Sequence, residues 1–351
     1  MSARPRPSPL SFGRGRSARS CLPPAHRRGR EPTGHLLFLL LACASAAQAG
    51  TAPGAVASFS VSAGGDGSHR TVQAAIDAAV AAGVPARIHV TAGIWRGVVD
   101  IPTGAPPIEL VGDGAGRTVL VNDHFAARIN PVTGQPFGTF GSATVFVRGD
   151  DFRASRLAIA NDAGPVGQAV ALAVIGTRAA FEHVRLRGHQ DTVYLQGRDS
   201  VSWFGDCEVE GTVDFIFGAG TALFERCRIH SLGDGYVTAA ATPQGRAFGL
   251  VFRDCELAAA PGVRNVYLGR PWREHARVAF LDSRLGGHIL AAGWHDWNQP
   301  HRQASAFFAE AGNTGPGAAT DARAPWSHRL DPAQAATYTR DAILGDWRPY
   351  E

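Results

Sequence analysis

The sequence predicts an all-β protein, a parallel β-helix with short capping helices at both ends. Three features predict it: a turn-rich composition, a repeated phenylalanine pattern, and helix signals confined to the two ends. The chain of 351 residues has 42 glycines and 22 prolines, and 45% of its residues are apolar. This composition favours short strands and frequent turns around a large buried core.

The repeat is a hexamer that begins with phenylalanine and ends with an aliphatic residue. One copy per coil, separated by loops of variable length, is typical of a parallel β-helix, in which equivalent positions stack about 4.8 Å apart. The first, fourth and last residues cannot all lie on one face of a strand, so we expect a bend within or beside the hexamer. The copies are Phe152–Leu157, Phe181–Leu186, Phe204–Val209, Phe224–Ile229, Phe252–Leu257 and Phe280–Leu285.

Helix signals flank this repeat. Residues 71–82 place apolar side chains on one helical face, and Gly83 suits the position after a helix C-terminus. Asp331 followed by Pro332 is typical of an N-cap and first helical residue, and predicts a helix that ends before Gly345. We expect residues 50–351 to form one domain.

Residues 1–49 are predicted to be a signal peptide. An arginine-rich start precedes the apolar run Leu36–Ala47, which is too short to span a bilayer. Ala47 and Ala49 satisfy the small-residue rule for cleavage before Gly50, so we expect a secreted protein without a membrane span. An alternative is a lipid anchor on Cys43.

Charge argues against binding to nucleic acid. All 34 basic residues are arginines, but eight of them and only one of the 30 acidic residues precede residue 50. The 26 basic and 29 acidic residues that remain give a slightly acidic body. We expect a monomer.

Three cysteines remain in the predicted mature chain: Cys207, Cys227 and Cys255, each at the fourth position of a hexamer. Stacking makes a bridge between Cys207 and Cys227 geometrically reasonable, and three stacked buried thiols are the alternative. No cysteine or histidine cluster has the spacing of zinc ligands, so neither a metal nor another cofactor is predicted.

Four segments concentrate polar side chains among strand-forming residues. Asp191 and Asp214 are 23 residues apart, as are Phe181 and Phe204, so we expect the two carboxylates on neighbouring coils. Asp214 lies in an apolar run and needs a partner, for which Arg270 is a candidate. The segments are GQAVAL (Gly167–Leu172), GHQDTVY (Gly188–Tyr194), GTVDFIFG (Gly211–Gly218) and YLGRPW (Tyr267–Trp272).

These segments resemble the signature blocks of the pectin methylesterase family, from about residue 60 to the chain end. The segment Asp331–Pro349 is similar to the bacterial branch of that family. The resemblance implies a right-handed parallel β-helix with an open cleft, and hydrolysis of methyl esters of polygalacturonate to carboxylates and methanol. The implied partner is methylesterified pectin, and no cofactor is implied.

The resemblance also implies a role for each matching residue. Asp214 matches the nucleophile, Asp191 the general acid and base, and Gln190 the residue that stabilises the transition state. Arg270 matches a catalytic residue that is hydrogen-bonded to the nucleophile. Cys207 and Cys227 match a family disulfide. Substrate contacts are implied for Thr139, Gln168, Tyr194, Phe217, Arg270 and Trp272.

Two other functions are compatible with the predicted fold: a β-helix enzyme that cleaves the polysaccharide chain, and a non-catalytic homologue. The first needs a different set of acids or a calcium site, and the second would be expected to have lost one of the matching polar residues. A buried aspartate beside an arginine is more often a structural ion pair, but the full set favours catalysis. Trp95 and Gly97 depart from the family pattern. Trp294, Trp297, Trp326 and Trp347 are expected to serve in packing.

Overall fold

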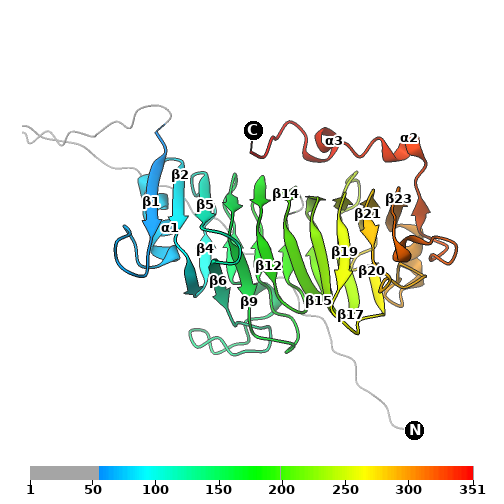
Figure 1. Cartoon of the computed structure of the whole chain (residues 1–351), viewed down its shortest axis with the longest axis horizontal. Coiled ribbons are helices and arrows are strands. Elements are labelled where there is room, and N and C mark those ends of the chain that lie inside the picture. Colours follow the sequence, from blue (N-terminus) through cyan, green and yellow to red (C-terminus); the bar gives the residue numbers. More distant parts are fainter. Residues whose placement is uncertain (1–54, 198, 351) are drawn as a thin grey trace, which may run out of the picture. The chain divides into compact units, whose positions relative to one another are not determined.

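The structure is a computed structural model that describes residues 55–197 and 199–350. The predicted signal peptide (residues 1–49) and the alternative anchor, Cys43, lie outside the described residues. The described chain is a right-handed parallel β-helix, as expected: every strand pair is parallel, and each coil adds one strand to each growing sheet (Figure 1).

One face of the β-helix is an 11-stranded sheet in which each strand pairs with its counterpart in the next coil. Its strands alternate inward and outward side chains, as in β2, where buried and exposed residues alternate. In order, the strands are β1 (Ala57–Val61), β2 (Ala86–Val90), β5 (Ile108–Gly112), β8 (Arg153–Ser155), β11 (Ala179–Glu182), β14 (Val201–Gly205), β16 (Thr221–Glu225), β18 (Leu250–Arg253), β21 (Arg277–Leu281), β23 (Phe307–Ala311) and β24 (His328–Arg329).

The other two faces are rows of strands that join where two long strands bend and serve both rows. These strands are β15 (Glu208–Gly218) and β17 (Arg228–Ala240). One row is β3 (Gly93–Arg96), β6 (Thr118–Asn122), β9 (Ala158–Asn161), β12 (Arg185–Arg187), the starts of β15 and β17, β19 (Glu256–Ala259) and β22 (Arg284–Leu285). The other is β4 (Val99–Ile101), β7 (Val145–Val147), β10 (Leu172–Val174), β13 (Val193–Leu195), the ends of β15 and β17, and β20 (Val266–Pro271).

The bend that the hexamer requires is a single residue in the left-handed region. In the fourth hexamer-bearing coil, for example, Arg226 separates the last residue of β16 from Cys227 and β17. Left-handed backbone is uncommon for non-glycine residues, so its recurrence at one position of each coil marks a regular corner of the β-helix. The corner residues have φ between 51° and 57° and are Arg156, His183, Asp206, Arg226, Asp254 and Asp282.

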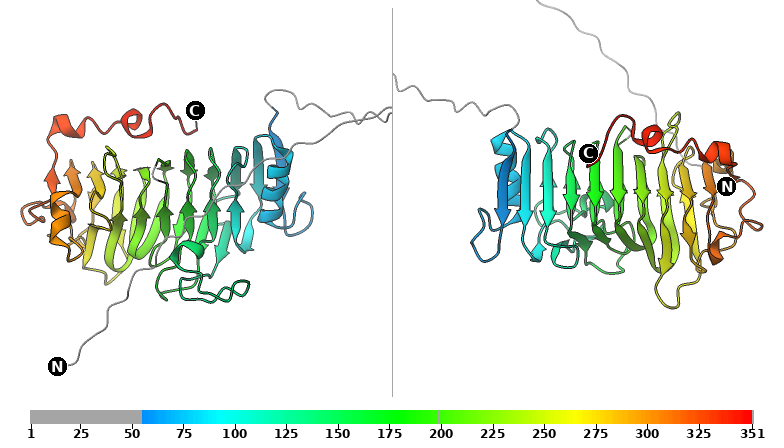
Figure 2. Two further views of the ribbon diagram at one scale, coloured as in Figure 1. Left: turned by 180° about the vertical axis from the view of Figure 1, so that it is seen from behind. Right: turned by 45° about the horizontal axis from the view of Figure 1, so that its top comes forward.

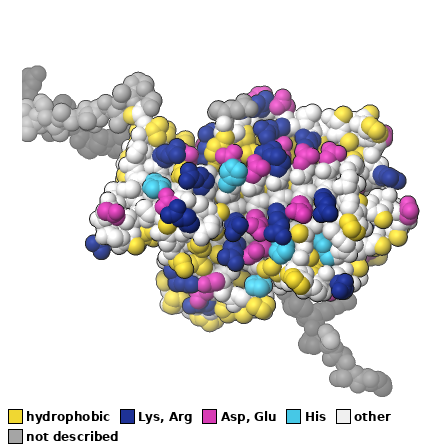
Figure 3. Space-filling model, in the orientation of Figure 1, with side chains coloured by type: hydrophobic (Ala, Val, Ile, Leu, Met, Phe, Trp, Pro, Cys, Tyr) yellow, Lys and Arg dark blue, Asp and Glu magenta, His cyan; other side chains and the backbone are white. Residues whose placement is uncertain are grey.

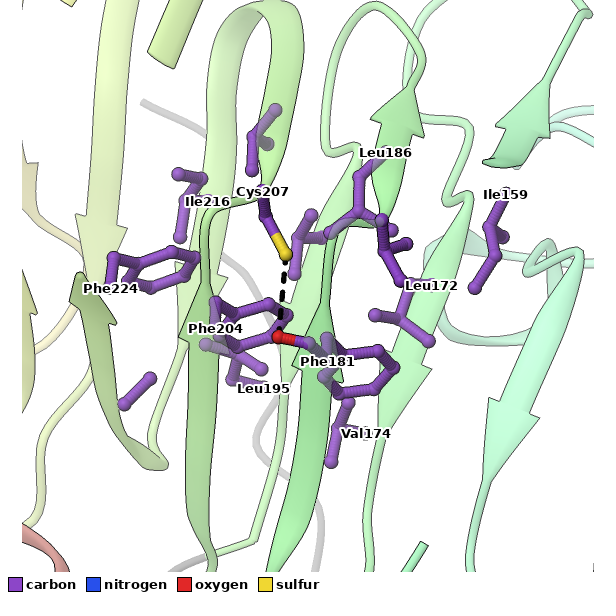
Figure 4. Packing of buried hydrophobic residues seen from close by; sticks show 14 of the residues in the cluster. Ile159, Leu172, Val174, Phe181, Leu186, Leu195, Phe204, Cys207, Ile216 and Phe224 are labelled. Carbon is purple, nitrogen blue, oxygen red and sulfur yellow. Dashed lines mark hydrogen bonds between the residues drawn. The ribbon is translucent and has the colours of Figure 1, made fainter. Parts of the chain in front are cut away.

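The phenylalanines of the hexamers form a stacked ladder inside the helix (Figure 4). The Phe204 and Phe224 rings, for example, lie 4.4 Å apart and within 6° of parallel. The first predicted copy is out of register, because Phe181 pairs with Ala154 and not with Phe152. Phe152 lies two residues earlier, and its ring still reaches the ladder, 6.0 Å from that of Phe181.

The expected disulfide between Cys207 and Cys227 is absent from the structure, in which these two residues and Cys255 are free and buried. Each sulfur donates to the backbone of the preceding coil, as Cys207 does to the Phe181 carbonyl at 3.4 Å (Figure 4). Burial raises the pKa of Cys227 and Cys255 well above the ordinary value, which favours the neutral thiol. The alternative of three stacked thiols is the one the structure adopts.

The N-terminal end is closed as predicted by α1 (Val72–Ala82), which has Thr71 as its N-cap and Gly83 with φ 67° after its last turn. The C-terminal prediction was wrong in two respects. The single expected helix is two, α2 (Pro332–Ala335) and α3 (Arg340–Leu344), because the Thr339 side chain caps a second start. These helices also do not cap the end: they run back over the 11-stranded sheet, where α3 packs on β14 and β16 (Figure 2).

Three short 3₁₀ helices lie in the loops, η1 (Thr139–Gly141), η2 (Pro300–Ala304) and η3 (Pro316–Ala318). Arginine and acidic side chains alternate over the face shown in Figure 3, which agrees with a body that is not basic. In the part of the chain that the structure describes, no helix is long and apolar enough to cross a membrane.

Candidate active site

Asp191 and Asp214 both occupy the left-handed region, with φ of 67° and 51°. Asp191 lies just before β13, at the corner where the chain passes onto the β13 face. Asp214 lies within β15, inside a shift of the pairing register with β17 that runs from Val213 to Ile216. Strained backbone of this kind is concentrated at functional sites. Here it occurs at two aspartates on adjacent coils.

Arg270 reaches Asp214 from β20, two coils along the sheet row. Its Nε donates to Oδ1 of Asp214 at 2.9 Å and its Nη2 donates to Oδ2 at 2.7 Å. This is the bidentate arrangement in which a guanidinium fixes both the charge and the orientation of a carboxylate. The pairing predicted from the apolar run around Asp214 is therefore present.

These residues line a cleft of about 220 Å³. Eight of the nine predicted catalytic and substrate-binding residues lie in its wall; Tyr194 does not. The Tyr194 ring is buried and stacks on that of Phe217, with the two ring centroids 4.8 Å apart. The predicted residues in the wall are Thr139, Gln168, Gln190, Asp191, Asp214, Phe217, Arg270 and Trp272.

The two carboxyls differ in electrostatics. Burial, and then the negative charge of Asp214, raise the pKa of Asp191 to about 8, against a smaller opposing effect of Arg270. Burial also raises the pKa of Asp214, but the hydrogen bonds and charge of Arg270 oppose it directly. At neutral pH Asp191 therefore keeps its proton, while the arginine favours the ionised form of Asp214.

A parallel bridge joins Gln168 and Gln190, so the two glutamines occupy equivalent positions of adjacent coils. Both side chains line the cleft beside the aspartates. An amide is a neutral hydrogen-bond donor, suited to an anion that forms near an existing carboxylate. Across residues 55–197 and 199–350, no group of three His, Cys, Asp or Glu side chains is arranged to hold a metal ion.

Sequence reasoning missed three cleft residues: Phe140, Ala239 and Trp297. Trp297 was expected to serve in packing, yet its ring lies 3.7 Å from the Arg270 Cζ atom. Phe140 is 53% exposed and its ring lies 4.8 Å from that of Tyr194. The one signal in the sequence for Phe140 was its position directly after Thr139. No repeat aligns the loops that carry Phe140 and Trp297.

Comparison with known proteins gives a family. The family model described as Pectinesterase matches residues 58–346. The chain belongs to the pectinesterase family. Pectinesterase 31 of Arabidopsis thaliana is 36% identical over 293 residues, which cover 81% of this chain and 91% of that protein. The probable pectinesterase/pectinesterase inhibitor 23 of the same plant is 35% identical, and there the chain spans 55% of the relative's length.

Solved pectinesterase structures share the fold. Pectin methylesterase from carrot superposes with a TM-score of 0.75 at 29% identity, covering 82% of this chain and 92% of that one. The enzyme PemA from Erwinia chrysanthemi gives 0.73 at 30% identity, covering 84% and 98%. A pectin methylesterase in complex with hexasaccharide VII gives 0.72 at 31% identity, covering 83% and 98%. The curated relatives named above are plant proteins, and they do not support the predicted placement in the bacterial branch.

Proposed function

We propose that this pectinesterase-family protein hydrolyses the methyl esters of galacturonate polymers, releasing methanol and free carboxylates. The observation that carries the proposal is that two aspartates in one cleft have different surroundings. Asp214 is held by Arg270, whereas Asp191 has a pKa raised to about 8. Two carboxyls whose environments differ in this way are suited to act as one nucleophile and one acid.

In the first step an oxygen of Asp214 attacks the ester carbonyl carbon. The carbonyl π electrons move to oxygen, and the amides of Gln168 and Gln190 donate to this oxyanion. When the oxyanion collapses, the bond to the methoxy oxygen breaks and Asp191 gives its proton to that oxygen. Methanol leaves, Asp191 is ionised, and the galacturonate carbonyl is bonded to Asp214 as an anhydride.

In the second step water attacks the same carbonyl carbon. Asp191 takes one proton from the water as the new bond forms, so it ends protonated as it began. The bond to Asp214 then breaks, and its electron pair restores the Asp214 carboxylate. The product is a galacturonate carboxyl, and Arg270 again pairs with an ionised Asp214.

The substrate assignment is supported by the cleft wall and by the relatives. Aromatic rings of Phe140, Phe217 and Trp272 surround the aspartates, with Phe217 and Trp272 edge to face at 5.9 Å. Rings of this kind pack against the apolar faces of sugars. We expect the protein to act as a monomer outside the cytoplasm after loss of residues 1–49.

Methanol release from highly methylated pectin tests the function. The purified protein is expected to release methanol while the polymer keeps its length, because no step above breaks a glycosidic bond. Viscosity and new reducing ends are measured on the same samples. Rapid viscosity loss with new reducing ends would instead indicate a chain-cleaving enzyme.

The roles of the aspartates are tested with two leaving groups. Asp191→Asn is expected to lose about 10²–10⁴-fold in turnover on a methyl ester, and less on an activated ester whose alcohol leaves without a proton. Asp214→Asn is expected to fail on both substrates. If the activated ester rescues Asp214→Asn but not Asp191→Asn, the two roles are reversed.

A further inference from the structure

Arg270 is bound along its edge and on both faces. Its Nε and Nη2 donate to Asp214, and its Cζ lies 3.8 Å from the Tyr236 ring centroid and 3.7 Å from that of Trp297. Two rings this close to one carbon cannot share a face of the planar guanidinium without overlapping. Tyr236 and Trp297 therefore cover opposite faces, each within the range of a cation–π interaction.

Three successive coils build this arrangement. Tyr236 lies on β17 and pairs with Tyr267 of β20, the strand that carries Arg270. Trp297 lies in the loop of the next coil. This loop is tied to β20 on both sides of Arg270: His295 N–H donates to the Gly269 carbonyl at 3.1 Å, and Arg302 Nη1 donates to the Pro271 carbonyl at 2.8 Å.

The loop holds Trp297 in a costly backbone conformation. Trp297 and Asn298 have φ of 61° and 54°, the left-handed region that bulky side chains rarely adopt. Side chains before them stabilise the turn: His295 Nδ1 accepts from the Trp297 N–H at 3.1 Å, and Asp296 Oδ1 accepts from the Asn298 N–H at 2.9 Å. Strain that is held by specific bonds indicates that the position of the ring matters.

The reaction cycle explains why the two faces of the Arg270 guanidinium, and not only its N–H edge, need to be held. While Asp214 is acylated, its carboxylate charge is gone and Arg270 has lost its counterion. The Arg270 side chain is only 17% exposed, so water replaces that counterion poorly. Aromatic faces stabilise a cation without using its N–H groups, which stay aimed at Asp214.

We propose that Tyr236 and Trp297 are positioning residues that hold Arg270 while Asp214 carries the acyl group. The proposal rests on the aspartyl mechanism given above. Tyr236 is the clean probe, because it lies outside the cleft wall whereas Trp297 lines it. Loss of the Tyr236 ring should therefore lower kcat and leave KM nearly unchanged.

The test compares Tyr236→Leu, Tyr236→Phe and the wild type in methanol release. Tyr236→Leu is expected to lose about 10-fold in kcat with KM within about 2-fold, and Tyr236→Phe to recover most of that loss because it keeps the ring. In Tyr236→Leu, a less restrained Arg270 should oppose the effect of burial on the pKa of Asp214 less well. That pKa should therefore rise, and the acid limb of kcat/KM should move to higher pH. Tyr267→Leu removes a ring that packs on Tyr236 and His295 without a cation–π contact with Arg270, so it should lower kcat less than Tyr236→Leu does.

A double-mutant cycle separates positioning from general packing. In an Arg270→Lys background the planar fork is already lost, so Tyr236→Leu should add less than about 2-fold. An equal loss in both backgrounds, or an unchanged kcat in folded Tyr236→Leu, would overturn the proposal. If Tyr236→Leu does not fold, Trp297→Leu is measured in the same cycle, with kcat and the acid limb as readouts. An inactive wild type would instead count against the proposed function itself.

Discussion

Two buried ion pairs of this protein have nearly the same internal geometry. Asp214 receives Nε and Nη2 of Arg270 at 2.9 and 2.7 Å, and Glu310 receives Nε and Nη2 of Arg323 at 2.8 and 3.1 Å. All four side chains are largely buried. Arrangement of the pair alone therefore cannot distinguish a catalytic carboxylate from a structural one.

The surroundings of the two pairs differ. Glu310 also accepts from Trp294 Nε1 at 3.1 Å and from Asn313 Nδ2 at 3.4 Å, while Arg323 donates to three backbone carbonyls. Among the described residues, Asp214 accepts side-chain hydrogen bonds from Arg270 alone, and it faces an open cleft that contains a second carboxyl. A carboxylate with unused lone pairs at a cleft is available for chemistry, whereas a saturated one is not.

The strongest test of this contrast is Asp214→Asn. The amide keeps the shape of the side chain but is a poor nucleophile, so turnover on methylated pectin should fall by about 10⁴-fold or more. Methanol release is measured together with binding of the polymer, which should be largely kept.

Asp206→Asn is a matched control for that variant. Asp206 also has φ 51° and also accepts two hydrogen bonds from an arginine, Arg226, but that pair is more exposed and Asp206 is not in the cleft wall. Its turnover should match the wild type. Near-normal turnover in Asp214→Asn would place the reaction elsewhere.

The sequence was sufficient to predict the fold where each coil repeats the hexamer. From Phe181 to Phe280 the predicted copies pair in register, because a phenylalanine fills each step of the ladder. The prediction failed at the first copy, where another side chain takes the ladder position, and no copy was predicted after Phe280. Ala154 occupies it in one coil and Glu310 in another, paired with Phe280. Which side chain takes the ladder position in those coils depends on packing against the neighbouring rings. That packing cannot be read from a single sequence.

The site was predictable where its residues follow the coil spacing or belong to a segment that resembles the family, and not elsewhere. Asp191 and Asp214 are related by the coil spacing, so their proximity follows from the repeat. Trp297 belongs to a loop outside the repeat, and its contact with Arg270 depends on left-handed backbone at two consecutive residues. Tyr236 was missed because a tyrosine in a strand gives no indication that its ring lies against a guanidinium of the neighbouring strand.

Glu310→Gln probes the structural pair. It removes the charge that neutralises Arg323, whose side chain is 6% exposed, and should lower the free energy of unfolding by about 3 kcal/mol. Turnover per folded molecule should stay unchanged. Denaturant unfolding and methanol release measure the two effects. A large loss of turnover without loss of stability would show that the C-terminal pair acts on the cleft.

The smallest expected effect concerns Asp191 and the pH dependence of stability. The pKa of Asp191 is raised to about 8 in the fold, from an ordinary value of 3.8. Between these values the folded protein keeps a proton on Asp191 that the unfolded chain has released. Each rise in pH therefore favours the unfolded chain, and the free energy of unfolding falls progressively from about pH 4 to about pH 8.

Asp191→Asn has no proton to lose and should avoid that cost. Its free energy of unfolding should exceed that of the wild type at pH 8–9, and the difference should shrink towards pH 4. Because the charge of Asp214 is the second cause of the shift, the same pH dependence should be weaker when measured in an Asp214→Asn background. A stability difference that does not change between pH 4 and pH 9 would mean that Asp191 titrates normally, and the assignment of Asp191 as the proton donor would lose its electrostatic basis.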